Sequence, residues 1–87
     1  MTEQIVEIIT KVLNNINEAL EDARLVNIEN KEEHIVFVIE ILDEFDENEL
    51  WLLNSEDIEK LSKGIKLDAW EMVYENGKIL LYIYVKK

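Results

Sequence analysis

The sequence predicts one small α+β domain in which a long N-terminal helix packs on one face of an antiparallel sheet. Apolar residues first recur every three or four positions, and their period then changes to two. The connections between these segments are short, which favours antiparallel pairing. The expected order is one helix, three strands, a short helix and two strands. A chain of 87 residues supports one hydrophobic core, so residues 1–87 are expected to form a single domain.

The first segment, residues 2–23, is expected to form an amphipathic helix. Thr2 can cap it, and Glu3 suits the positive end of the helix dipole. The apolar face contains Ile5, Ile8 or Ile9, Val12, Leu13, Ile16, Ala19, Leu20 and Ala23. The opposite face is expected to contact water and contains Glu7, Lys11, Asn14, Asn15, Glu18 and Glu21 or Asp22.

Two strands are expected next, at residues 25–28 and 34–42. A four-residue loop between them places Ile28 opposite Ile35, and it places Glu29 opposite His34 as a surface pair. The second of these strands is almost continuously apolar, which predicts a central position in the sheet.

An acidic connection at residues 43–49 is expected to lead to a third strand at 50–53, which returns alongside the second. A short helix follows, because Asn54 or Ser55 can cap it and Gly64 is suited to the position after its end.

The clearest local prediction is a hairpin over residues 66–85. Asn76-Gly77 is the favoured dipeptide for a two-residue type I′ turn, and it pairs Glu75 with Lys78. One face of this hairpin is apolar and is assigned to the core, including Trp70. The other face mixes apolar and charged residues and is a candidate binding surface. It contains Ala69, Glu71, Val73, Glu75, Lys78, Leu80, Tyr82, Tyr84 and Lys86.

The formal net charge of −11 restricts the partners of this chain. Direct binding to nucleic acid or to an anionic membrane needs clustered Lys or Arg, so neither is expected. The charge is concentrated in residues 40–59, called the acidic segment, which hold no base. Its acids are Glu40, Asp43, Glu44, Asp46, Glu47, Glu49, Glu56, Asp57 and Glu59. The expected partner is another protein with a basic surface.

The sequence contains no recognisable catalytic or cofactor-binding motif. There is no Cys, one His, and two isolated Gly, which argues against thiol nucleophiles, thiolate metal sites and glycine-rich phosphate loops. A calcium loop is also disfavoured, because frames starting at Asp43 or Asp46 place Phe45 or Leu50 at ligand positions. We therefore expect no enzyme activity, no cofactor and no metal. No signal peptide or membrane-length apolar run is present, which predicts a cytoplasmic protein.

The first functional hypothesis is that the acidic segment and Trp51 dock on a basic protein surface that normally binds nucleic acid. Carboxylates at strand or helix spacing lie about 5 to 7 Å apart, close to the spacing of phosphates along one strand. In size, acidity and lack of motifs the chain resembles small phage and viral anti-defence proteins, including anti-CRISPRs. This likeness of composition implies an inhibitor or nucleic-acid mimic. The alternative is an acidic loop that only aids solubility.

The second hypothesis is an assembly module. Val73, Leu80, Tyr82 and Tyr84, or the edge of the final strand, then form a homodimer or receive a partner. The alternative for this face is that the first helix covers it, which makes its tyrosines structural. An enzyme is a third class, for which no residue can be named.

Overall fold

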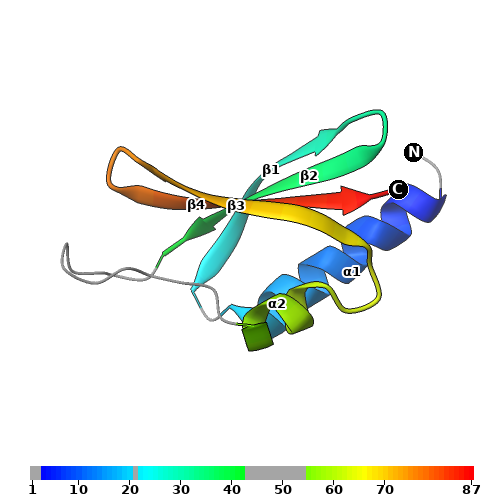
Figure 1. Ribbon diagram of the computed structural model, residues 1–87, viewed down its shortest axis with the longest axis horizontal. Helices are drawn as coiled ribbons and strands as arrows, with labels where there is room; N and C mark the ends of the chain where they lie inside the picture. Colours follow the sequence, from blue (N-terminus) through cyan, green and yellow to red (C-terminus); the bar gives the residue numbers. More distant parts are fainter. Residues whose placement is uncertain (1–2, 21, 43–54) are drawn as a thin grey trace.

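The structure is a computed structural model that describes residues 3–20, 22–42 and 55–87 (Figure 1). It confirms the α+β class with the long helix on one face of the sheet. The elements are α1 (Glu3–Ala19), β1 (Ala23–Asn30), β2 (His34–Ile41), α2 (Ser55–Leu61), β3 (Leu67–Glu75) and β4 (Lys78–Lys86). The strands form one antiparallel sheet in the order β1-β2-β4-β3. The predicted acidic connection at 43–49 and third strand at 50–53 lie outside the described residues.

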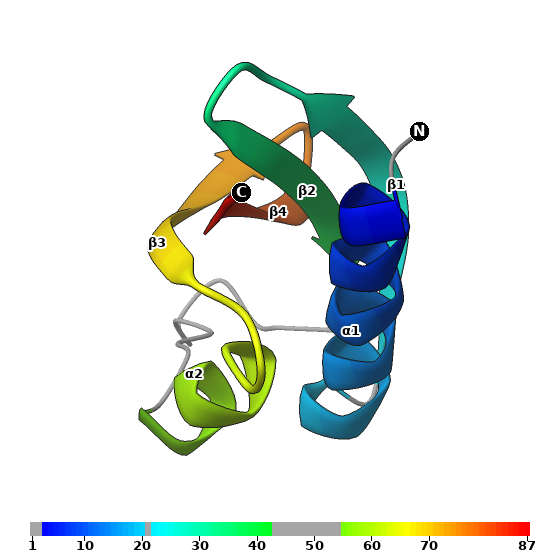
Figure 2. The same ribbon diagram turned by 90° about the vertical axis from the view of Figure 1, so that its right-hand side faces the viewer.

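The helix α1 covers one face of the sheet, called the inner face, and buries Val12 and Ile16 there, as does Leu20 directly after the helix. Figure 2 shows α1 beside β1 and β2, with β3 on the far side of the sheet. The helix ends at Ala19, earlier than predicted, because the chain already enters β1 at Ala23.

Asn15 was assigned to the exposed face of the first helix, and this prediction is wrong because the residue is buried. Its side-chain amide donates to the carbonyls of Leu61 and Lys63, with both distances at 2.9 Å. Leu61 ends α2 and Lys63 lies in the turn that follows it, where backbone acceptors have no partner within the helix. Asn15 therefore joins the two helices by satisfying acceptors that would otherwise be desolvated without a hydrogen bond.

The hairpin formed by β1 and β2 has a different register from the predicted one. Ile28 lies opposite Phe37, so the expected pairs of Ile28 with Ile35 and of Glu29 with His34 are both wrong. The cause is the position of the loop. The last observed pair is Asn30 with Ile35, so the four residues between the paired positions are 31–34 instead of 30–33.

The central position predicted for the second strand is confirmed. β2 lies between β1 and β4, and all of its residues from Ile35 to Ile41 are buried. Residues that project to both faces of β2 are buried, which agrees with its almost continuous apolar sequence.

The predicted hairpin of β3 and β4 is confirmed in its turn and in its register. Asn76 and Gly77 have φ angles of 50° and 73°, as a type I′ turn requires, and Glu75 pairs with Lys78. The assignment of Trp70 to the core is wrong, because this residue is 40% exposed. β3 is an edge strand on the side of the sheet away from α1 (Figure 2), so its inner-face residues receive less cover.

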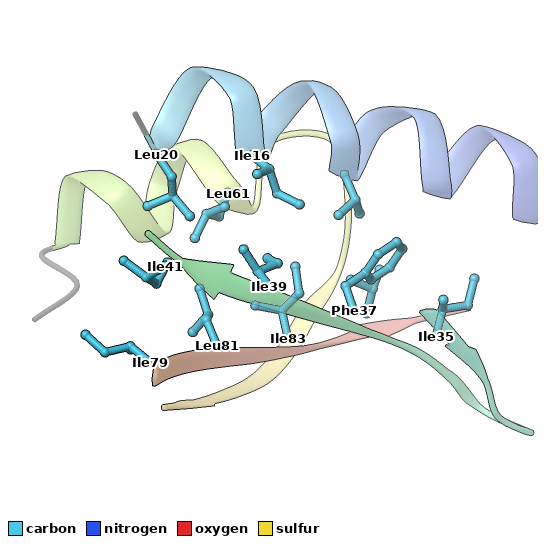
Figure 3. Close-up of a cluster of buried hydrophobic side chains, with 12 residues drawn as sticks. Ile16, Leu20, Ile35, Phe37, Ile39, Ile41, Leu61, Ile79, Leu81 and Ile83 are labelled. Carbon is cyan, nitrogen blue, oxygen red and sulfur yellow. The ribbon is translucent and has the colours of Figure 1, made fainter. Parts of the chain in front are cut away.

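The hydrophobic core lies between the two helices and the inner face of β2 and β4 (Figure 3). Phe37 and Ile39 of β2 point from the sheet toward the helices, and Leu61 of α2 points back. The buried cluster consists of Val12, Ile16, Leu20, Ile35, Phe37, Ile39, Ile41, Leu61, Ile79, Leu81, Ile83 and Val85. This packing holds the sheet as a platform whose opposite face, called the outer face, points away from both helices.

Candidate binding surface

The outer face is built from alternate residues of all four strands, because side chains along a strand alternate between the two faces. From β1 to β3 its rows read Arg24, Glu40, Leu80 and Val73, then Asn27, Val38, Tyr82 and Glu71, then Glu29, Val36, Tyr84 and Ala69. The structure therefore brings Val73, Leu80, Tyr82 and Tyr84 together on one face, as predicted. Both helices pack on the inner face, so the alternative in which α1 covers these tyrosines is wrong.

An apolar strip runs along the middle of the outer face and consists of Val36, Val38, Val73, Leu80, Tyr82 and Tyr84, called the outer strip. Val36 and Val38 are buried, although neither helix lies over them, and Tyr84 and Tyr82 of β4 lie directly across from them. The other members are half-buried. The predicted site lacked Val36 and Val38, because a continuously apolar strand does not reveal which of its residues lie beside the tyrosines.

Tyr84 is held in place by its neighbour on β3. Its hydroxyl donates to the Glu71 carboxylate at 3.2 Å. Burial raises the pKa of Tyr84 above its ordinary value of 10.0, and the hydrogen bond to Glu71 and the negative charge of Glu71 raise it further. The folded protein therefore favours the neutral phenol at this position.

Alkaline pH is expected to destabilise the protein through Tyr84. Because the pKa of Tyr84 is raised in the folded state, the unfolded chain releases this proton first. The contribution is fully present below pH 10.0 and is lost as the pH rises through the folded pKa. Chemical unfolding at increasing pH should show a steeper loss of stability for the wild type than for Tyr84→Phe. Parallel curves would contradict this assignment.

A salt bridge crosses the outer face between β1 and β2. Arg24 Nη2 lies 2.9 Å from Glu40 Oε2, and Arg24 Nε also donates to the same oxygen at 3.3 Å. Glu40 is only 8% exposed. Because it is buried and paired, Glu40 does not contribute to an exposed acidic docking surface, contrary to the prediction.

His34 lies at one end of the outer face, where its Nε2 is 2.8 Å from Asp68 Oδ2. The predicted partner was Glu29, but Glu29 lies opposite Val36 on β2. Asp68 is brought to His34 by a bulge in β3 between Leu67 and Ala69. The prediction that His34 makes a surface pair holds, with a different acid.

Three acids of the acidic segment lie on α2. Glu56 and Glu59 are exposed, and Asp57 is half-buried. Lys60 lies 3.6 Å from Glu56 one turn away. The remaining predicted contact residues, Asp43, Glu44, Asp46, Glu47, Glu49 and Trp51, lie outside the described residues. The placed acids do not form one surface, because Glu40 is on the outer face and α2 packs on the inner side.

The edge predicted for the final strand is not available for docking. β4 lies between β2 and β3, and the strands at the two edges of the sheet are β1 and β3. The error arose because the order of strands does not follow the order of the sequence.

A cleft of about 400 Å³ lies between α1, the segment after α2 and the end of β4. Apolar walls are provided by Ile8, Ile65 and Val85. The polar lining residues include Glu7 and the lysines Lys11, Lys66, Lys86 and Lys87. Lys11 is paired with Glu7 at 3.7 Å. The cleft was not predicted, because its lysines are far apart in the chain.

No protein-family model matches this chain, and comparison with curated proteins and with solved structures gives no match either. Within the described ranges, no group of three His, Cys, Asp or Glu side chains is placed to hold a metal ion. None of the helices described is long and apolar enough to cross a membrane.

Proposed function

We propose that this protein is a binding module whose outer face receives another protein. The observation that carries the proposal is the outer strip, an apolar surface with two tyrosines that neither helix covers. Tyr side chains combine a large apolar ring with a polar hydroxyl, and they are enriched among residues that dominate binding energy. An apolar and aromatic centre surrounded by charged residues is the usual composition of a protein interface.

The proposed partner has a basic surface around an apolar contact site. The net charge of −11 attracts a basic protein over long range and repels an acidic one. Tyr82 and Tyr84 then provide the short-range contacts. We further propose that the partner's basic surface normally binds nucleic acid, so that binding inhibits it. The absence of cysteine suits a reducing compartment, and the cytoplasm is the proposed location.

The acidic segment is proposed as a second contact that adds charge to this interaction. What supports it is the exposure of Glu56 and Glu59 on α2. Their part in binding is distinguishable from that of the outer strip, because exposed charge pairs weaken in salt and apolar contacts do not.

The test begins with tagged protein and a nuclease-treated lysate of its source or host cell. The captured partner is then purified, and its affinity is measured against variants. The combined variant Tyr82→Lys with Tyr84→Lys is expected to weaken binding by about 100-fold, because it places two charges in the apolar centre. Circular dichroism checks its fold, and Tyr82→Ser provides a milder change at the same place.

Leu13→Lys serves as the matched control, because Leu13 is an exposed apolar residue on the other side of the molecule, on α1. It should leave the affinity unchanged. Glu56→Lys with Glu59→Lys should reduce only the salt-sensitive part of binding, as should reversal of Asp43, Glu44, Asp46 and Glu47. A partner bound equally by the wild type and the tyrosine variants would contradict the proposal.

A further inference from the structure

The turn between β3 and β4 places an asparagine directly before a glycine. The chain contains eight asparagines, and Asn76 is the one that a glycine follows. Asparagine is thermally labile, because its side-chain amide can react with the main-chain nitrogen of the next residue. A side chain on that next residue hinders the reaction, and Gly77 has no Cβ. The sequence therefore makes Asn76 the most reactive asparagine of the chain.

The structure leaves the reacting groups open to solvent. Asn76 and Gly77 are both exposed, at the tip of the hairpin drawn as the orange loop in Figure 1. Even a Cβ added at Gly77 would meet no heavy atom within 4 Å. The β3–β4 ladder ends at the pair of Glu75 with Lys78, so the nitrogen of Gly77 lies beyond the last pair. Water and hydroxide can reach both groups in the folded protein.

We propose that Asn76 is a site of spontaneous deamidation in the folded protein. The main-chain nitrogen of Gly77 loses its proton to hydroxide, and its electron pair attacks Cγ of Asn76. A new C–N bond closes a succinimide ring, the Cγ–Nδ2 bond breaks, and the amide nitrogen takes a proton from water and leaves as ammonia. The reaction needs no partner and no oxidant, because both reacting groups belong to this chain.

Water then opens the succinimide ring at one of its carbonyl carbons. Attack at Cγ restores the normal backbone and gives aspartate. Attack at the main-chain carbonyl carbon gives isoaspartate, in which the chain runs through Cγ. In both cases one water is consumed and one ammonia is released in the whole reaction. Each product carries one more negative charge than Asn76.

The two products differ in their effect on the hairpin. Aspartate suits the turn, because Asp-Gly is also a favoured type I′ dipeptide. Isoaspartate adds a methylene to the main chain between the two turn positions. The turn then no longer has the geometry that pairs Glu75 with Lys78, and turn geometry sets the register of a hairpin. Isoaspartate is therefore expected to loosen the end of the hairpin, where Val73 pairs with Leu80.

Mass spectrometry of protein incubated at mildly alkaline pH tests the proposal. Cleavage after Lys66 and Lys78 releases residues 67–78, called the turn peptide, in which Asn76 is the one side-chain amide. The turn peptide is expected to gain mass steadily as its amide becomes an acid, and to do so faster at higher pH. A sample digested without incubation corrects for reaction during handling.

The same digest contains a matched control. Cleavage after Arg24 and Lys31 releases residues 25–31, which hold Asn27 and Asn30. Both asparagines are exposed on β1, but each precedes a residue with a long or branched side chain. This control peptide should react at least about tenfold more slowly than the turn peptide, because glycine does not follow either asparagine. Equal mass gains in the two peptides would overturn the assignment to the Asn76-Gly77 pair.

A synthetic turn peptide gives the rate of the reaction without the fold. The folded protein is expected to react within about tenfold of this rate, because exposed loop tips open at little cost in free energy. Folded protein whose turn peptide stays unmodified, after half of the synthetic peptide has reacted, would overturn the proposal. The fold would then protect Asn76.

Urea unfolding tests the effect on the hairpin. A methyltransferase specific for isoaspartate identifies incubated protein that contains it, and this protein should unfold at a lower urea concentration than fresh protein. Asn76→Gly keeps a favoured turn dipeptide without the reactive amide, so incubation should leave its midpoint unchanged. Asn76→Asp has the new charge on a normal backbone and should unfold near fresh wild type. Isoaspartate-containing protein with the midpoint of Asn76→Asp would overturn the proposed loosening.

Discussion

Replacing Phe37 with alanine is expected to lower the free energy of unfolding by about 3 to 5 kcal/mol. Phe37 is fully buried on the central strand β2, opposite Ile28 on one side and Ile83 on the other. Its ring points into the space between sheet and helices (Figure 3), so the substitution leaves a cavity that both layers border. Domains of this length have a total stability of about 4 to 13 kcal/mol, so the loss is a large fraction of it.

Urea unfolding followed by circular dichroism measures this effect, and the midpoint should fall while the slope stays constant. Leu13→Ala is the matched control, because Leu13 is 39% exposed on α1. We expect it to change stability by at most about 1 kcal/mol. Similar losses in the free energy of unfolding for the two variants would show that Phe37 stabilises the core no more than an exposed residue does.

The parts of the fold that could be predicted from sequence are those determined by local chemistry. The β3–β4 hairpin has the predicted register from Glu75 back to Ala69, because Asn76 and Gly77 adopt the positive φ angles that define their turn and therefore its register. The β1–β2 hairpin has no such dipeptide in its loop. Its register depends on the bulge between Leu25 and Asn27 and on strand length, which the apolar pattern does not reveal.

Contacts between distant segments explain the other differences. The periodicity of α1 placed Asn15 on the exposed face, but α2 packs against that position and its carbonyls accept hydrogen bonds from the Asn15 amide. Alternation likewise placed Trp70 on the inner face. Whether a helix covers that face depends on strand order, and β3 is at the edge. Partners such as Asp68 for His34 follow from the same order of strands.

The candidate site was predictable in part for the same reasons. Alternation along β4 grouped Leu80, Tyr82 and Tyr84, and the hairpin register added Val73. The acids of residues 40–59 were grouped because they are close together in the sequence. Closeness in the sequence does not determine which side chains are exposed. Glu40 shows the difference, because it belongs to the acidic segment in sequence and to the buried sheet in space.

Glu40→Lys is the second change with a large expected effect, a loss of about 3 kcal/mol in the free energy of unfolding. It removes the buried carboxylate that pairs with Arg24 at 2.9 Å and places a second positive charge beside Arg24. An amine at this position is desolvated among the strands of the outer face without an opposite charge. Urea unfolding measures the loss, with Glu59→Lys on the exposed side of α2 as the control at about 0.5 kcal/mol or less.

The reciprocal exchange, Arg24→Glu combined with Glu40→Lys, separates the charge pair from the shape of the site. Opposite charges are then restored across the same β1–β2 ladder, so the double variant should regain at least about 1 kcal/mol relative to Glu40→Lys alone. Failure to regain stability would mean that the pair does not stabilise the sheet. Recovery would show that charge reversal at Glu40 alone destabilises the fold, so a loss of partner binding in that variant would be explained by unfolding. Reversal at Glu56 or Glu59 tests the acidic surface itself.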